Sequence, residues 1–205
     1  MNDSRLRFIA ALQENQAEFG IALSEKNAEN LFVYYEFVEK HNQILHLVAP
    51  TSPENFAVRH VLESLFLQNF LPKNVRFADI GTGAGLPSIP CLIFREDLRG
   101  ILIESKLKKA SFLSNAVKEC NLENRAKVFD RQFEELAKPQ ADFVTCRALD
   151  KFVEKLPRII KWSKGCKLLL YGGESLGEKL KSCGIKFDQK LIPKSEKRFL
   201  FIAQN

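Results

Sequence analysis

The sequence predicts an α/β fold, in which a mostly parallel sheet carries helices on both faces and a helical cap precedes it. Amphipathic helical patterns dominate residues 5–70. From Val75 onward, short apolar runs alternate with helical patterns, which is typical of a parallel sheet built from strand–helix units. The last two apolar runs flank a basic turn and favour an antiparallel hairpin at the sheet edge.

The helical patterns divide a single globular unit into an N-terminal cap, residues 1–72, and a main domain, residues 73–205. The cap is expected to hold helices over residues 5–19, from Ser24 onward, and over residues 55–70. Ser24 followed by Glu25 is a typical helix start. The Leu71-Pro72 pair ends the third helix, because proline disfavours a helical residue before it.

The main domain is expected to alternate between strands and helices. The strand patterns are VRFADI, GILIE, AKVFD, ADFVTC and CKLLLY, followed by the two runs of the hairpin. Helices are expected over residues 88–94, 107–120 and 150–162, and over LGEKLKSCG at residues 176–184.

Composition narrows the class of protein. The apolar fraction of 45% and the charged fraction of 27% are typical of a globular domain. The net charge of +6 suits a polyanionic partner. Five scattered cysteines form no Cys-x-x-Cys pair, so we expect neither a zinc site nor a disulfide framework. We also expect no membrane span, and a monomer in the cytoplasm.

The stretch FADIGTGAGLPSIP, residues 77–90, carries the most informative motif. Glycines 81, 83 and 85 follow a strand, where bare backbone permits a tight turn and close approach to a ligand. Leu86 occupies the third glycine position of a dinucleotide fingerprint, and no Gly-Lys-Ser or Gly-Lys-Thr follows. The remaining pattern, Asp79-x-Gly-x-Gly-x-Gly, is typical of class I methyltransferases that use S-adenosylmethionine.

Acidic positions downstream agree with this interpretation. Glu104 ends the next strand, where its carboxylate can accept both ribose hydroxyls, although dinucleotide enzymes place an acid similarly. Phe133-Glu134 follows the third strand and is a candidate for the adenine pocket. On the general methyltransferase pattern, Asp79 helps to hold the cationic methionine end of the cofactor.

Beyond the glycine turn, the residues resemble the RsmG (GidB) family, which makes 7-methylguanosine in bacterial 16S ribosomal RNA. The segments that carry the resemblance are FADIGTGAGLPSIPCLIF with its Leu-Pro and Ile-Pro pairs, ESKLKKASFL, HNQILHLVAPTSPENFAVRHVLESL, TCRAL and EKRFLFIA. The resemblance covers most of the chain. It implies a Rossmann-like class I methyltransferase that acts on a guanine of the 530 loop, in 16S RNA or in the small ribosomal subunit.

The resemblance also implies roles for particular residues. Arg147, in TCRAL, is expected at the end of the fourth strand, facing the cofactor and the incoming base. S-adenosylmethionine, and S-adenosylhomocysteine as product, are expected at Asp79, Gly81, Thr82, Gly83, Gly85, Leu86, Glu104, Phe133, Glu134 and Arg147. RNA is expected at Arg59, His60, Lys151, Lys155, Arg158, Lys197 and Arg198. Lys151, Lys155 and Arg158 share one helical face by their spacing.

No catalytic acid–base residue and no metal are expected. Guanine N7 has a lone pair and no proton to lose, so the reaction requires orientation and a cation-tolerant pocket. We expect His60 to be a hydrogen-bonded helix residue. The TCRAL segment lacks the Pro-Pro-Tyr motif of adenine amino-methylation, and Cys146 lacks the Pro-Cys context of pyrimidine C5 methylation.

Three departures from the family pattern keep alternatives open. Ser88 replaces a glycine, His46-Leu47-Val48 replaces Asn-Leu-Thr, and Tyr171 occupies the position of a family lysine. A small-molecule methyltransferase and a non-catalytic S-adenosylmethionine-dependent RNA-binding factor therefore remain as alternative functions. An NAD-linked oxidoreductase is less favoured because of Leu86.

Overall fold

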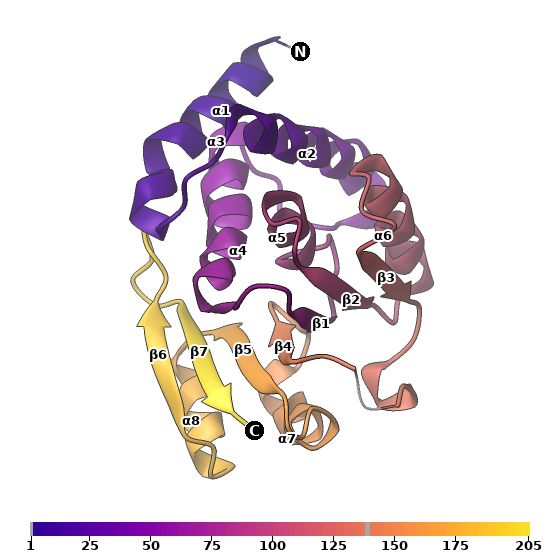
Figure 1. The fold of residues 1–205 in the computed structure, drawn as a ribbon, viewed down its shortest axis with the longest axis vertical. Coiled ribbons are helices and arrows are strands. Elements are labelled where there is room, and N and C mark those ends of the chain that lie inside the picture. Colours follow the sequence, from indigo (N-terminus) through magenta and orange to yellow (C-terminus); the bar gives the residue numbers. More distant parts are fainter. Residues whose placement is uncertain (1, 138–139) are drawn as a thin grey trace.

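The computed structural model describes residues 2–137 and 140–205, and its centre is one seven-stranded sheet (Figure 1). The strand order is β3-β2-β1-β4-β5-β7-β6. The strands are β1 (Arg76–Ile80), β2 (Arg99–Ile103), β3 (Ala126–Phe129), β4 (Phe143–Cys146), β5 (Lys167–Gly172), β6 (Phe187–Leu191) and β7 (Phe199–Gln204). Strands β1 to β5 pair in parallel, whereas β7 runs antiparallel to both β5 and β6. The predicted mostly parallel sheet and its edge hairpin are confirmed.

The cap begins with α1 (Asn2–Asn15), the 3₁₀ helix η1 (Gln16–Phe19) and α2 (Glu25–Leu45). The predicted start at Ser24 is confirmed. The Ser24 side chain accepts a hydrogen bond from the Asn27 N–H, and the Asn27 side chain accepts one from the Ser24 N–H. This capping box fixes the first turn of α2.

The predicted third helix is a chain of four helical segments of three types rather than one α-helix. It consists of α3 (Pro53–Phe56), the π-helical turn η2 (Ala57–Leu62), α4 (Glu63–Leu65) and the 3₁₀ helix η3 (Phe66–Phe70). The carbonyls of Arg59 and His60, in the π turn, accept hydrogen bonds from the side chain of Arg147. Widened turns recur where a side chain inserts into the helical ladder, which local sequence does not reveal.

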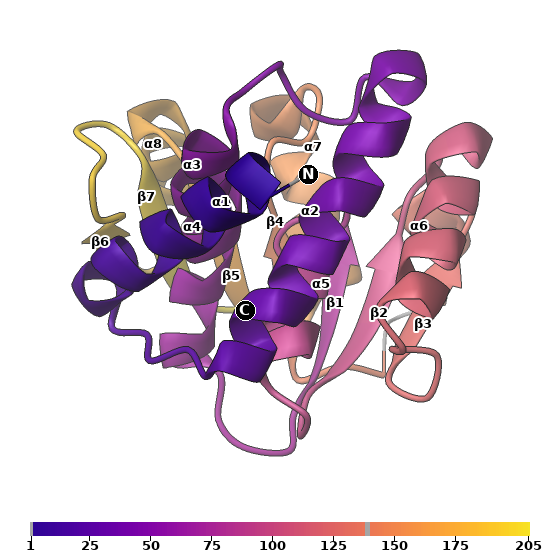
Figure 2. The same ribbon diagram turned by 90° about the horizontal axis from the view of Figure 1, so that it is seen from above.

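Helices cover both faces of the sheet. The cap, α5 (Ser88–Phe94) and α6 (Leu107–Glu119) lie on one face, while α7 (Phe152–Trp162) and α8 (Glu174–Ser182) lie on the other (Figures 1 and 2). Between β3 and β4, the described residues hold only the short 3₁₀ helix η4 (Phe133–Glu135). None of the described helices combines the length and the apolar character that crossing a bilayer requires.

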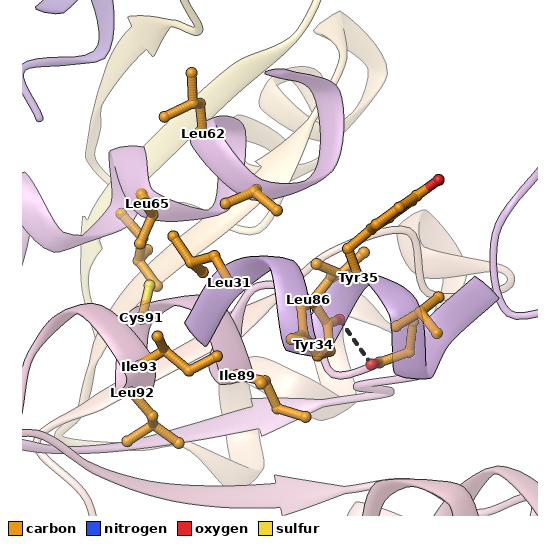
Figure 3. Close-up of a cluster of buried hydrophobic side chains, with 14 of the residues drawn as sticks. Leu31, Tyr34, Tyr35, Leu62, Leu65, Leu86, Ile89, Cys91, Leu92 and Ile93 are labelled. Atoms are coloured by element: carbon orange, nitrogen blue, oxygen red, sulfur yellow. Dashed lines mark hydrogen bonds between the residues drawn. The ribbon is translucent and has the colours of Figure 1, made fainter. Parts of the chain in front are cut away.

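The cap and the sheet share one hydrophobic core. Leu31 of α2, Leu65 of α4 and Leu92 of α5 belong to the same buried cluster (Figure 3). Within it, the buried Tyr34 hydroxyl of α2 donates a 2.9 Å hydrogen bond to the carbonyl of Ala84, in the glycine-rich turn. Cap packing therefore supports the backbone that the sequence marks as a ligand site.

Candidate functional site: a pocket at the glycine-rich turn

A pocket of about 470 Å³ lies at the carboxyl ends of β1, β2 and β4, where open α/β sheets bind ligands. It draws its walls from the cap loop, the glycine-rich turn, the start of α6 and the segment after β4. The lining residues are Leu47, Val48, Ala49, His60, Gly81, Thr82, Gly83, Ala84, Leu86, Glu104, Ser105, Lys106, Lys109, Arg147, Ala148, Leu149, Asp150 and Lys155.

The glycine-rich turn is held in place by backbone bonds to β2. The N–H groups of Gly81 and Thr82 both donate to the carbonyl of Ile103, at 2.8 and 3.2 Å. A Cβ on Gly83, at φ +59°, would meet only the carbonyl oxygen of Gly81, at 3.8 Å, while a Cβ on Gly85, at φ +98°, would overlap Ile89. The turn thus needs glycine for conformation at both positions, and at Gly83 it offers bare backbone to a ligand.

Glu104 lies at the end of β2 and touches the turn directly. Its side chain accepts hydrogen bonds from the N–H of Gly83 at 3.1 Å and from the N–H of Lys106 at 2.8 Å. Each carboxylate oxygen uses one acceptor site in this way and retains another for a ligand hydroxyl. The carboxylate is therefore oriented in advance for a diol such as the ribose of S-adenosylmethionine.

Asp79 lies beneath the turn and is not among the pocket-lining residues. Its side chain is fully buried, and its Oδ2 accepts a 2.5 Å hydrogen bond from Ser88 Oγ. Its Oδ1 has no hydrogen-bond partner among the described residues. Burial raises the pKa of Asp79 to about 7, against the opposing hydrogen bonds from Ser88 and Thr82. Ser88 thus contacts the motif acid directly.

Phe133 and Glu134 border a small recess beside the main pocket. The recess also touches Gly81 and Ile103, which places it next to the glycine-rich turn as an adenine site requires. Phe133 is buried and packs edge-on against Trp162 at 5.5 Å. Glu134 forms an ion pair of 3.3 Å with Arg158, so residues expected at the cofactor and at the RNA contact one another.

Arg147 lines the pocket, but the protein itself occupies most of its hydrogen-bonding capacity. Nη1 donates to the His60 carbonyl and to Ser64 Oγ, and Nη2 donates to the Arg59 carbonyl and to Glu63. Four of the five guanidinium N–H groups are thereby engaged. Among the described residues, only its Nε–H has no such contact, and this group and the planar face are what remain for a ligand.

His60 also lines the pocket, with its ring 5.0 Å from that of Phe56. Burial, followed by the charges of Arg147, Arg59 and Arg198, lowers the pKa of His60 to about 4. The imidazole is therefore neutral at physiological pH. It offers one donor and one acceptor beside the pocket, and it is a weak base.

The other cations expected at RNA lie around this edge on two elements. Lys155 lines the pocket, and Lys151 and Arg158 are exposed on or just before α7. Lys197 is exposed in the β6–β7 connection, and Arg198 is half-buried against Glu63. Sequence reasoning missed Glu63, because an acid inside an amphipathic helix has no distinguishing pattern until its partners are known.

A second cavity of about 470 Å³ lies on the β2–β3 face, lined among others by Arg99, Phe129 and Trp162. It does not include the glycine-rich turn or Glu104. The pocket at the carboxyl ends of the strands is therefore the better candidate, since it contains the groups that bind a nucleoside.

Comparison with solved structures shows the fold. A precorrin-6y C5,15-methyltransferase from Geobacter metallireducens superposes with a TM-score of 0.53 at 15% identity, covering 70% of this chain and 87% of that one. TYW2 from P. horikoshii, in complex with MeSAdo, gives 0.56 at 14% identity, with 71% and 62% covered. The predicted Rossmann-like architecture is thereby confirmed.

Comparison with sequences shows the family. A ribosomal RNA small subunit methyltransferase G from Xanthomonas axonopodis pv. citri is 38% identical over 73% of this chain and 70% of its own. One from Chromobacterium violaceum is 33% identical, over 80% and 79%. The methyltransferase G of Nitrosospira multiformis is 39% identical, and the match spans about half of each protein: 55% of this chain and 52% of that relative. The family profile described as rRNA small subunit methyltransferase G, GidB, matches residues 27–202, and this chain belongs to that family.

Proposed function

We propose that this protein transfers a methyl group from S-adenosylmethionine to N7 of a guanine in the 530 loop of 16S ribosomal RNA. The observation that carries the proposal is the pocket in which the glycine-rich turn and the oriented carboxylate of Glu104 meet a cationic rim. Lys106, Lys109 and Lys155 belong to that rim. A nucleoside cofactor fits the first part, and an RNA phosphate backbone fits the second.

The glycine-rich turn and Glu104 would hold the cofactor, which would supply a methyl group on a sulfonium. Transfer to N7 would leave a neutral thioether and a positively charged guanine, so no residue of this chain would have to accept or supply a proton. The chain therefore needs to hold and align its substrates. Its residues agree, because His60 is a weak base with a pKa of about 4 and Glu104 already accepts two backbone N–H groups.

Charge distribution supports RNA as the acceptor. Residues 151–205 carry 13 Lys and Arg against 5 Asp and Glu, whereas residues 1–150 carry 18 against 20. The positive charge is thus concentrated in the segment that begins beside the pocket with α7 and ends with the β6–β7 hairpin. A folded RNA can be held by phosphate contacts along this side while one base enters the pocket. This substrate places the activity in the cytoplasm.

The test uses purified protein, S-adenosylmethionine labelled in its methyl group, and small ribosomal subunits from a strain that lacks this gene. We expect about one label per subunit, on a single loop guanine at N7, and no label on free guanosine or other small acceptors. Naked 16S RNA, tested in parallel, shows whether the substrate is free RNA or the small ribosomal subunit. Cofactor binding without label in either RNA would refute the proposal and favour a binding factor.

A further inference from the structure

Glu63 forms the centre of a charge cluster that the proposed reaction does not use directly. Its side chain is 3% exposed, and three guanidinium groups surround it. Glu63 Oε1 lies 2.6 Å from Arg198 Nη2 and 3.9 Å from Arg59 Nε, and Glu63 Oε2 lies 3.1 Å from Arg147 Nη2. A buried carboxylate is unfavourable unless it is paired and hydrogen-bonded, so the positions of these partners are tied to it.

The three arginines come from different parts of the fold. Arg59 lies in the π turn of the cap, Arg147 follows β4, and Arg198 precedes β7 in the hairpin connection. The two oxygens of Glu63 are divided between them: Oε2 accepts from Arg147 and Oε1 from Arg198. One carboxylate thus joins the wall of the pocket to the connection that carries Lys194 and Lys197.

Tyr171 completes the cluster from β5. The Arg147 guanidinium lies over the Tyr171 ring, 5.6 Å from its centroid. The Tyr171 hydroxyl contacts the carbonyls of Glu63 and Ser64, at 3.0 and 3.2 Å, and can donate to either. Tyr171 therefore supplies a flat surface for Arg147 and an anchor for the backbone of α4.

We propose that Glu63 is a positioning residue of the methyl-transfer site. Its carboxylate holds Arg147 against the π turn, so that His60 and the free Nε–H edge of Arg147 keep their places in the pocket wall. The same carboxylate holds Arg198, and with it the basic hairpin connection, at the same edge of the sheet. The kinetic consequence rests on the proposed function, whereas the positioning itself does not.

The first test observes the guanidinium groups and needs no activity. Nitrogen-15 NMR of arginine side chains should show narrow, slowly exchanging Nη–H signals for Arg147 and Arg198, whose Nη2 groups contact Glu63, assigned with R147Q and R198Q. In Glu63→Gln, the Arg198 signal should broaden and exchange with water at least about ten times faster, because a neutral amide cannot hold two cations. Glu63→Asp keeps the charge and should restore much of the protection.

The second test separates binding of the two substrates. In E63Q we expect the KM for the RNA substrate to rise about ten-fold or more, while the Kd of S-adenosylhomocysteine changes by less than about three-fold. Combined with R198Q, the E63Q change should add less than it does alone, because both variants remove the Arg198–Glu63 contact and only E63Q also removes the Arg147–Glu63 contact. The control is Glu54→Gln, which breaks the Arg7–Glu54 pair elsewhere on the cap.

The outcomes distinguish this proposal from the proposed function. Unchanged arginine signals in folded E63Q, or a loss of thermal stability with KM unaltered, would show that Glu63 is only structural. If E63Q does not fold, the same measurements on E63D decide, with an intermediate KM expected. If the wild-type protein transfers no methyl group, the proposed function fails, while the NMR result still decides whether Glu63 orders the two arginines.

Discussion

At the scale of single residues, the site combines one carboxylate that is prepared for a ligand with another that is kept out of reach. Glu104 touches the pocket and retains free acceptor sites, whereas Asp79 lies under the turn with one unpartnered oxygen. Both were predicted as cofactor residues from the same motif logic. Their surroundings now assign them different physical roles, and each role can be measured.

Glu104→Gln should weaken binding of S-adenosylhomocysteine. The amide has a single acceptor oxygen, and its NH₂ must face either a backbone N–H or the ligand. Loss of a charge-assisted hydrogen bond costs about 1.5–3 kcal/mol, which corresponds to about ten- to a hundred-fold in Kd. Isothermal titration calorimetry measures this, with Glu119→Gln at the exposed end of α6 as the control. An unchanged Kd would remove Glu104 from the binding site.

Asp79 should make stability depend on pH. The unfolded chain releases this proton near pH 4, whereas burial raises the pKa in the folded protein to about 7. Between those values the folded state binds the extra proton, so its stabilising effect is full below pH 4 and is lost as pH rises to 7. In urea denaturation, the free energy of unfolding of the wild type, measured relative to that of Asp79→Asn, should fall by about 2 kcal/mol from pH 5 to pH 7.

The corresponding control is Asp188→Asn, at an exposed position on β6, for which no such trend is expected. If the difference between wild type and D79N stayed flat across this range, Asp79 would be ionised throughout in the folded protein. Its unpartnered oxygen would then need a cation that the described residues do not provide.

At the scale of elements, the local sequence pattern predicts α7 well but does not predict the form of the third cap helix. Spacing alone predicted that Lys151, Lys155 and Arg158 share one helical face. The structure starts α7 at Phe152, two residues later than predicted, so Lys151 is its N-cap and has a left-handed backbone. The helix over residues 53–70 instead changes type three times. In its π turn, the carbonyls of Arg59 and His60 accept hydrogen bonds from Arg147, which is more than eighty residues away in sequence.

Lys151 and Lys155, at the start of α7, should contribute to RNA binding by neutralising phosphates. Replacing Lys151 and Lys155 by glutamine should reduce the slope of log K against log salt by about 1.5 to 2, because two phosphates would no longer be neutralised. The matched control is Lys164→Gln with Lys167→Gln, exposed cations near the opposite end of α7. Filter binding to 16S RNA at several salt concentrations measures both. Equal slopes for the two double variants would place the RNA elsewhere.

At the scale of the whole molecule, the cap is part of the main core. The same buried cluster contains Leu31 from α2 and Phe77 from β1. Tyr34 adds a buried hydrogen bond from the cap to the glycine-rich turn. Shared packing of this kind makes separate unfolding of the cap unfavourable, since it would expose the face of the sheet to water.

Leu31→Ala should therefore lower the stability of the entire chain by about 2–5 kcal/mol. Far-UV circular dichroism and the fluorescence of Trp162, which lies on the α7 side of the sheet, should report the same lowered midpoint. The exposed Leu191→Ala serves as the control, with an effect below about 1 kcal/mol. If the fluorescence midpoint stayed at its wild-type value, the cap would be a separately unfolding unit.

Local pattern alone determined the order of strands and helices, the antiparallel hairpin, the Ser24 cap and the glycine-rich turn. These depend on periodicity, on capping and on the backbone freedom of glycine, all of which act over a few residues. Resemblance of several short segments then identified the family correctly. The predicted RNA and cofactor residues gather around one edge because parallel strands bring their carboxyl ends together.

Only the tertiary structure decided what each charged group does there. It buried Asp79 beneath the turn, engaged four of the five donors of Arg147 in the protein, and made Glu63 the shared partner of three arginines. The physical reason is that hydrogen-bond partners and dielectric surroundings are set by contacts between residues up to 135 positions apart. A sequence motif specifies which groups are present, but their protonation and their free donors depend on what packs around them.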